Sequence, residues 1–196
     1  MSKPAEKLKI SIDDYLEGES ISEIKHEYIN GKMFAMPDVN RKHNLITGNL
    51  LALLYNHLRG TPCRVFHSDM KVGVLTATDD IFYYPDVQVS CEKNGNSHYN
   101  AEPKLIIEVL SDSTERKDRV EKFHTYRKLA SLEEYVLVAQ DCFRVEIYRR
   151  RNGWDVELLG EGQSFQLESV GLDFTMADVY RDVEFLIICV WTMKIH

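Results

Sequence analysis

The sequence predicts a mixed α/β protein of the α+β type, in which a mixed β-sheet is flanked by helices. Apolar runs typical of strands alternate with two longer stretches of helical periodicity, and the later strand patterns follow one another as hairpins. The chain has 196 residues, 44% of them hydrophobic, which is enough for a sizeable core without metal or disulfide staples. We therefore expect a single domain over residues 1–184.

The N-terminal part predicts a short helix, a hairpin and a long helix. The short amphipathic helix is expected around Ser11 to Glu17. Strands from Ile24 to Ile29 and from Lys32 to Met36 flank Asn30-Gly31, and this dipeptide is the strongest short-range signal for a hairpin turn. The long helix is expected from about Asn40 to Arg59, where apolar side chains recur at helical spacing.

The middle and C-terminal parts predict strands around one further long helix. Strands are expected over residues 64–66 and 71–75, around Asp86 and Glu108, and over residues 135–139, 143–148 and 154–159, with a polar loop over 91–103. Capping residues at 111–114 predict a helix from Glu115 to Ala130. Thr175 is expected to cap a last short helix through Asp178.

Two carboxylates within apolar strand patterns are the strongest functional signal. Asp86 follows Pro85 and precedes an alternating strand pattern, and Glu108 lies inside the apolar run 105–110. An unpaired ionised carboxylate is strongly disfavoured there, so each needs a cation, a basic partner or water. Mg²⁺ prefers oxygen ligands of this kind. The alternatives are a turn residue after Pro85 for Asp86 and a buried Lys or Arg partner for Glu108.

The predicted helix after Glu108 carries three polar residues on one face. Asp118, Lys122 and Tyr126 recur at four-residue intervals, so Lys122 can stand beside Glu108. Alternatively, Asp118 and Lys122 form an ordinary salt bridge on a solvated face, and Tyr126 is a packing residue.

The pattern Pro85-Asp86, a spacer and then Glu108 resembles the Pro-Asp…(Asp/Glu)-x-Lys signature of the restriction-endonuclease-like nuclease superfamily. The usual lysine position is occupied by Leu110, which resembles the variant whose lysine lies on the following helix. The chain is similar in particular to the Uma-two family of restriction endonuclease-like proteins. The matching segments, between about Ile12 and about Val183, are His26–Gly31, His43, Tyr84–Val87, Ile107–Ser111, the three helix residues, and Glu134-Tyr135; Asp112 replaces the usual proline.

The resemblance implies a restriction-endonuclease-like core and hydrolysis of DNA phosphodiester bonds with Mg²⁺ or Mn²⁺; RNA is an alternative substrate. Asp86 and Glu108 would hold the ion together with the main-chain carbonyl of Val109. Lys122 would position the attacking water and offset charge on the phosphate. A catalytically inactive scaffold that binds nucleic acid or a protein partner is the alternative function.

Three further residues are expected at the catalytic site with less support from the pattern. His43 would lie at the entrance of the long helix, where a cap or a surface position explains it equally well. Glu27 lies in the predicted hairpin, where a solvent-facing glutamate is the simpler interpretation. Tyr126 is equally a packing residue and a site residue.

The charge balance limits the expected mode of nucleic-acid binding. The net charge is −7, from 24 Lys and Arg against 31 Asp and Glu, which weighs against an avid, sequence-independent binder. Basic residues nevertheless cluster on the predicted helix and at a hairpin tip. Arg116, Arg119 and Arg150 are therefore candidate phosphate contacts, with solubility as the alternative explanation.

The cysteines and the chain ends bear on location and assembly. Cys63, Cys91, Cys142 and Cys189 form no Cys-x-x-Cys pair, which argues against a zinc site and for a reducing compartment. The N-terminus lacks a secretory signal pattern, so we expect a cytoplasmic protein with no membrane partner. The apolar extension 185–196 is too short to span a bilayer, and a strand packed on the body, a dimer contact and an accidental extension are its three alternatives. We expect a homodimer.

Overall fold

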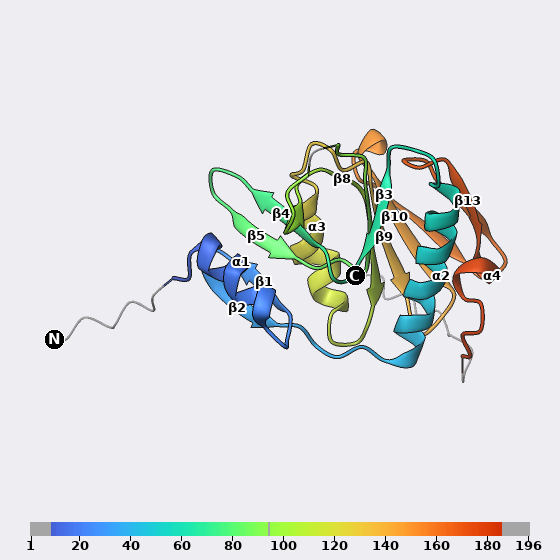
Figure 1. The fold of residues 1–196 in the computed structure, drawn as a ribbon. Coiled ribbons are helices and arrows are strands. Elements are labelled where there is room, and N and C mark those ends of the chain that lie inside the picture. The colour runs from blue at the N-terminus through green and yellow to red at the C-terminus, as the bar shows by residue number, and fades with distance from the viewer. Residues whose placement is uncertain (1–8, 94, 186–196) are drawn as a thin grey trace.

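The computed structural model describes residues 9–93 and 95–185, and its centre is a six-stranded mixed sheet (Figure 1). Its strand order is β11-β10-β9-β8-β6-β3, in which β8 and β9 are parallel and the other neighbours are antiparallel. In chain order the strands are β3 (Arg64–His67), β6 (Val87–Ser90), β8 (Pro103–Leu110), β9 (Glu134–Ala139), β10 (Arg144–Arg149) and β11 (Val156–Gly160). The expected mixed sheet is confirmed.

A second, five-stranded sheet has the order β2-β1-β5-β4-β7 and carries the N-terminal hairpin. Its strands are β1 (His26–Ile29), β2 (Lys32–Ala35), β4 (Lys71–Leu75), β5 (Asp80–Tyr83) and β7 (Tyr99–Asn100), and a separate hairpin is formed by β12 (Ser164–Leu167) and β13 (Leu172–Thr175). Asn30 and Gly31 both have positive φ, 50° and 89°, as a two-residue hairpin turn requires. The short strand β7 lies within the segment that the sequence predicts as a polar loop.

Helices lie on both faces of the six-stranded sheet. The helical segments of the chain are α1 (Ile12–Ile21), α2 (Arg41–His57), a π-helix η1 (Lys117–Lys122), α3 (Phe123–Tyr126), a 3-10 turn η2 (Arg150–Asn152) and α4 (Met176–Val179). Of these, α1 packs against the five-stranded sheet through Tyr15. Figure 1 shows α2, α4 and β13 on one side of this sheet and α3 with β4 and β5 on the other. The flanking helices are therefore as expected.

Strand β8 is buried on both faces, and its alternation decides where Glu108 points. Leu105, Ile107 and Val109 pack in the core that contains α2. Ile106 and Leu110 pack in the opposite core, with side chains of β4, β5 and α3. Because successive strand residues point to opposite faces, Glu108 shares the face of Ile106 and Leu110. It therefore points toward η1 and α3.

Local capping fixes the beginning of α2. The Asn40 side chain accepts a hydrogen bond of 3.0 Å from the His43 amide, as expected of an N-cap residue. At the other end of the chain, Thr175 and Asp178 form a reciprocal capping box at α4, so the predicted last helix is confirmed.

Two elements near the acids differ from the sequence prediction. Asp86 lies in a bend between β5 and β6 rather than on a strand. The helix predicted from Glu115 to Ala130 contains the π-helix and ends at Tyr126. Helical periodicity read from a sequence assumes 3.6 residues per turn, so it does not reveal a π segment.

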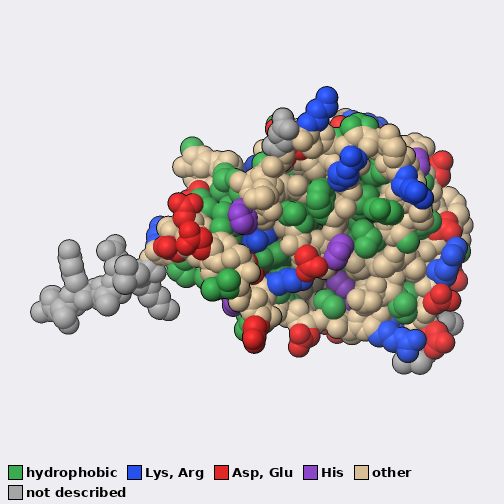
Figure 2. All heavy atoms as spheres, viewed as in Figure 1, with side chains coloured by type: hydrophobic (Ala, Val, Ile, Leu, Met, Phe, Trp, Pro, Cys, Tyr) green, Lys and Arg blue, Asp and Glu red, His purple; other side chains and the backbone are tan. Residues whose placement is uncertain are grey.

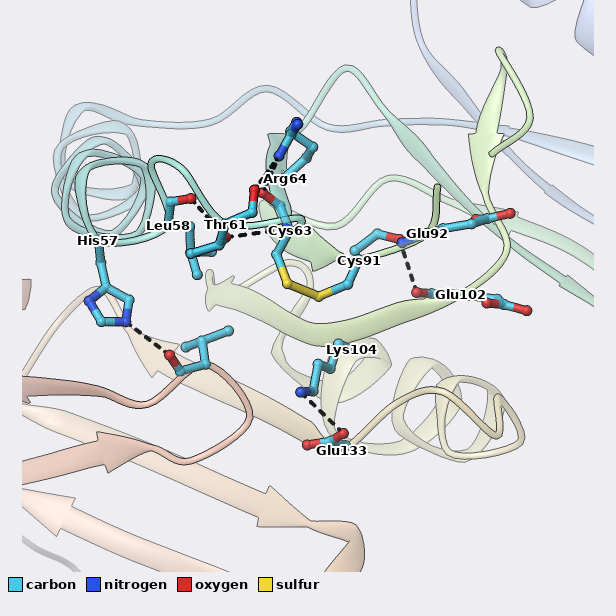
Figure 3. The surroundings of a disulfide bond; sticks show 12 residues. His57, Leu58, Thr61, Cys63, Arg64, Cys91, Glu92, Glu102, Lys104 and Glu133 are labelled. Carbon is cyan, nitrogen blue, oxygen red and sulfur yellow. Dashed lines mark hydrogen bonds and ion pairs between the residues drawn. A yellow bond between two sulfur atoms is a disulfide. The ribbon is translucent and has the colours of Figure 1, made fainter. Parts of the chain in front are cut away.

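A disulfide bond joins Cys63 to Cys91 (Figure 3), which is a correction to the inference drawn from the cysteine pattern. The two cysteines are 28 residues apart in sequence. They become neighbours because β3 and β6 pair antiparallel, with Arg64 opposite Ser90, and each cysteine lies one position beyond this pair. The positions of the cysteines in the sequence do not indicate which of them pair.

The last described residue, Phe185, packs against Phe143 and Tyr180 with ring centroids 4.8 and 5.5 Å away. The rest of the predicted apolar extension, residues 186–196, lies outside the described residues. Within residues 9–93 and 95–185, no helix has the length and apolar character needed to cross a membrane. The homodimer and the cytoplasmic location stay predictions.

Candidate active site

A cavity of about 230 Å³ brings together polar residues from six segments of the chain. Its polar and charged lining is Glu27, Asp38, His43, Tyr84, Asp86, Glu108, Ser111, Ser113, Thr114, Lys117, Asp118 and Lys122. In the space-filling view, acidic, basic and histidine side chains adjoin near the middle of the visible face (Figure 2). The cavity is thus lined by six of the expected site residues: Glu27, His43, Asp86, Glu108, Val109 and Lys122.

Asp86 is held in place by the neighbouring strand and by α2. Its Oδ2 accepts a hydrogen bond of 2.7 Å from the Val109 amide and lies 3.2 Å from His43 Nε2. Its other oxygen, Oδ1, accepts no hydrogen bond from the described residues. The bend after Pro85 therefore positions the Asp86 carboxylate so that the Val109 amide occupies Oδ2 and Oδ1 is left without a hydrogen bond from the described residues.

Glu108 is almost completely buried, with 2% of its surface exposed. Its Oε1 accepts hydrogen bonds from Lys122 Nζ at 3.1 Å and from Tyr126 at 3.3 Å. Its Oε2 accepts none within the part of the chain that the structure describes. Burial raises the pKa of Glu108 well above its ordinary value of 4.5, against the lowering effect of Lys122 and with the help of Asp118 and Asp86.

Lys122 is the buried cation of the site and contacts three acids. Its Nζ lies 3.1 Å from Glu108, 3.1 Å from Asp118 and 3.4 Å from Glu27. Burial opposes its positive charge, but the three carboxylates outweigh burial and raise the pKa of Lys122 well above 10.5. Lys122 is therefore an ammonium at neutral pH.

Glu27 and Tyr126 both reach this cluster. Glu27 is 5% exposed, not solvent-facing, and bridges Lys122 to Lys117, which pairs with its Oε2. Tyr126 is fully buried and packs edge-on against Tyr83, in addition to its hydrogen bond to Glu108. Burial raises the pKa of Tyr126, and the nearby Glu108 raises it further. Tyr126 thus both packs and contacts the acid.

The three candidate phosphate contacts lie outside the lining of this cavity. Arg116 is exposed, whereas Arg119 pairs with Glu115 and Glu146. Arg150 donates to the main-chain carbonyls of Leu132, Leu129 and Arg127 beyond the end of α3. Lys and Arg side chains are spread over the visible face and do not form one basic patch (Figure 2). Their role in nucleic-acid binding stays a prediction.

Lys117 is one of several lining residues that are not among the site residues expected from the sequence. The α-helical periodicity places it on a different face from Lys122, five residues later. The π-helix brings both side chains to Glu27. Only knowledge of the π-helix would have identified Lys117 as a site residue, and no pattern in the sequence indicates that helix.

The donors around the cavity fit a single divalent cation held by two carboxylates and a carbonyl. Asp86 and Glu108 each keep one oxygen without a hydrogen bond from the described residues, and both line the cavity. The N–H and C=O of a strand residue point to the same neighbour, so the Val109 carbonyl faces the Asp86 side together with its amide. Among the described residues, no group of three or more His, Cys, Asp and Glu side chains is arranged to hold an ion. Asp86 and Glu108 are therefore the two carboxylates that could hold such an ion.

Glu134 shows what a purely structural buried glutamate looks like in this chain. It is 1% exposed, and both of its oxygens accept hydrogen bonds. Oε1 accepts from Arg149 Nε at 2.8 Å and from the Glu168 amide at 3.1 Å, while Oε2 accepts from the amide and hydroxyl of Ser169. Glu108 differs because one of its oxygens is left for another ligand.

Comparison with known proteins places the chain in a family. The family model described as "Uma2: Putative restriction endonuclease" matches residues 12–178. Two proteins of Synechocystis sp. are similar: uncharacterized protein slr1290 is 33% identical over 181 residues, 90% of this chain and 94% of that protein. Uncharacterized protein sll1609 is 34% identical over 160 residues, 78% of this chain and 89% of that protein.

A crystal structure from Anabaena variabilis, described as a "putative nuclease belonging to DUF820", has a similar fold. The TM-score is 0.70 at 20% sequence identity, and the likeness covers 87% of this chain and 97% of that one. The fold is therefore restriction-endonuclease-like. The family match covers most of the chain, including every residue of the cavity. This chain belongs to the Uma2 family of restriction endonuclease-like proteins.

Proposed function

We propose that this protein is a nuclease that hydrolyses DNA phosphodiester bonds with Mg²⁺ or Mn²⁺ at the cavity between Asp86, Glu108 and Lys122. The observation that carries the proposal is the contrast between two buried glutamates. Glu134 has both oxygens occupied by protein donors, whereas Glu108 has one oxygen left and faces a cavity with Asp86. A buried acid with an unused oxygen is costly unless a cation or water completes it.

Asp86, Glu108 and the Val109 carbonyl would hold the ion. A bound Mg²⁺ or Mn²⁺ supplies polarisation of the phosphate and a lowered pKa for an attacking water. Lys122 keeps its proton in this environment, so it can orient that water and offset the charge that develops on phosphorus. Tyr126 donates to Glu108 Oε1 and fixes the orientation of its carboxylate. His43, in the first turn of α2, lies 3.2 Å from Asp86 Oδ2 and would help to orient that carboxylate.

The experiment measures cleavage and ion binding separately. Wild-type protein is incubated with supercoiled plasmid in Mg²⁺, Mn²⁺ or EDTA, alongside Glu108→Gln, Lys122→Met and the control Lys128→Met. Lys128 pairs with Asp79 and lies outside the cavity, so its variant loses the same charge without touching the acids. Calorimetry with Mn²⁺ follows ion binding in the same four proteins.

We expect the wild type and Lys128→Met to nick plasmid only with a divalent ion. Glu108→Gln should lose both Mn²⁺ binding and nicking. Lys122→Met should keep Mn²⁺ binding but lose about 10²- to 10³-fold in rate, as removal of one electrostatic contact to the transition state typically does. If the wild type cleaves neither single- nor double-stranded DNA in the presence of a divalent ion, the nuclease proposal is wrong. The alternative function, a catalytically inactive scaffold, then replaces it.

A further inference from the structure

Two lysines contact the same glutamate from the two ends of one π-helix. Lys122 Nζ lies 3.4 Å from Glu27 Oε1, and Lys117 pairs with Glu27 Oε2. Both ammonium groups also lie over the ring of Tyr83, 5.4 Å from its centroid for Lys117 and 5.7 Å for Lys122. The two positive charges are thus gathered around one carboxylate and one aromatic ring.

The π-helix is what makes this arrangement possible. In an α-helix, residues five apart are separated by roughly 140° around the axis, because each residue turns by about 100°. In η1, the Phe123 amide donates to the Asp118 carbonyl, which is the five-residue hydrogen bond of a π-helix. Residues five apart are then neighbours on one face. Lys117 and Lys122 therefore both point into the cavity, which an uninterrupted α-helix would prevent.

The two lysines differ in their surroundings. The Lys122 side chain is 6% exposed and is also paired with Glu108 and Asp118. The Lys117 side chain is 29% exposed, and among the described residues Glu27 is its single ion-pair partner. Its ammonium lies 5.8 Å from the centroid of Phe34, which is itself 44% exposed. Lys117 is accordingly the cation at the mouth of the cavity, with access to solvent.

We propose that Lys117 is a second phosphate-binding residue of this site, which contacts the DNA backbone beside the bond attacked at Asp86 and Glu108. This inference rests on the proposed function. An ammonium is a compact point charge suited to a phosphate oxygen. Glu27 holds Lys117 in position before DNA arrives, and the partial exposure of Lys117 lets a phosphate oxygen join or replace the Glu27 carboxylate. Lys122 is enclosed by three acids, and its proposed role remains to orient the attacking water and to offset charge on the phosphate that reacts.

The test measures DNA binding without cleavage. Fluorescence anisotropy measures the affinity of the full chain for a short fluorescein-labelled DNA duplex and for its single strand, over a range of salt concentrations. Ca²⁺ replaces Mg²⁺ in these measurements, and a gel run afterwards shows whether the labelled DNA has stayed uncut. The proteins are the wild type, Lys117→Ala, Lys117→Arg and Lys128→Ala. Lys128→Ala removes the same charge from a residue that pairs with Asp79 outside the cavity.

We expect Lys117→Ala to raise Kd about 10-fold and to reduce the slope of log Kd against log salt by about one, as loss of one phosphate contact does. Lys117→Arg should keep most of the affinity, and Lys128→Ala should match the wild type. Thermal melting of each variant shows whether it is folded. Equal affinities for Lys117→Ala and Lys128→Ala would overturn the inference, as would a loss of affinity in Lys117→Arg as large as that in Lys117→Ala.

The outcomes separate this inference from the proposed function. If the wild type binds DNA but cleaves none with Mg²⁺ or Mn²⁺, the nuclease proposal fails and the binding comparison still decides the role of Lys117. If the wild type cleaves DNA and Lys117→Ala binds as tightly as the control, the role of Lys117 alone is wrong. If the wild type binds neither probe, both are wrong.

Discussion

The Val109 amide donates a hydrogen bond of 2.7 Å to Asp86 Oδ2, and this bond joins the bend before β6 to the strand that carries Glu108. It gives Asp86 two separable roles. One is to accept a hydrogen bond from a partly buried amide, and the other is to present a negative charge to the cavity. An amide side chain can take over the first role but not the second.

Asp86→Asn should therefore keep the fold and lose the ion. The amide oxygen can still accept from Val109, so we expect a melting temperature close to that of the wild type with strongly weakened Mn²⁺ binding by calorimetry. Asp86→Ala leaves the Val109 amide without its acceptor and should cost about 1–3 kcal/mol of unfolding free energy. Equal destabilisation by both substitutions would show that the hydrogen bond contributes nothing.

The pH dependence of stability should reveal the buried Glu108. Its pKa in the folded protein is raised above the value of 4.5, mainly by burial, so the folded state binds this proton more tightly than the unfolded state. This tighter proton binding adds to the unfolding free energy below about pH 4.5, and the added free energy is lost as the pH rises toward the pKa of Glu108 in the folded protein. In EDTA, the unfolding free energy of the wild type should consequently fall relative to that of Glu108→Gln as the pH increases from 4.5.

Urea denaturation of both proteins between pH 4.5 and 8 measures this difference. A tenfold difference in proton affinity between the folded and unfolded states corresponds to about 1.4 kcal/mol. Glu108→Gln also removes a partner of Lys122, which adds an offset between the two curves, so the prediction concerns their slopes. Parallel curves would contradict a raised pKa for Glu108.

The Cys63–Cys91 disulfide should contribute to stability without contributing to the site. It closes a loop with a sequence separation of 28 residues. The chain-entropy model assigns such a loop roughly 3–4 kcal/mol. For a chain of this size, that corresponds to a fall of roughly 6–15 °C in melting temperature on reduction.

Calorimetric melting with and without dithiothreitol checks this, and a thiol assay should find two more thiols after reduction. Cys63→Ser cannot form the bond, so its melting temperature should not respond to the reductant. An identical response in that variant would assign the effect to another cysteine.

Arg150 should act on stability through the turn that follows α3. Its guanidinium donates 2.7 Å to the Leu132 carbonyl and also to the Leu129 carbonyl, and it lies 5.1 Å from the centroid of the Trp154 ring. Arg150→Ala leaves these carbonyls to water and should cost about 1–3 kcal/mol of unfolding free energy.

Urea denaturation measures that cost, with Arg116→Ala as an exposed arginine control. Anisotropy below the onset of unfolding then measures the predicted DNA contact of Arg150 on its own. An unchanged urea midpoint would mean that the carbonyl contacts have no net effect on stability.

The sequence by itself predicted most elements and the residues around which the candidate site is built. Strand and hairpin patterns depend on nearest neighbours along the chain, so the Asn30-Gly31 turn and the β8 run around Glu108 could be predicted from the local sequence. The cost of burying Glu108 is also a local property, since the apolar run around it leaves no other environment. A site built on Asp86, Glu108 and Lys122 followed from these features and from the family resemblance.

Tertiary structure alone decided which residues meet. The pairing of β3 with β6 turns two distant cysteines into a disulfide. The π-helix adds Lys117 to the cavity, because five-residue hydrogen bonding is invisible to a 3.6-residue periodicity. The hairpin β1–β2 brings Glu27 to both lysines. Glu134 accepts hydrogen bonds from protein donors at both of its carboxylate oxygens, whereas Glu108 accepts them at one. The donors come from chain segments that only folding brings together, so the sequence does not show this difference.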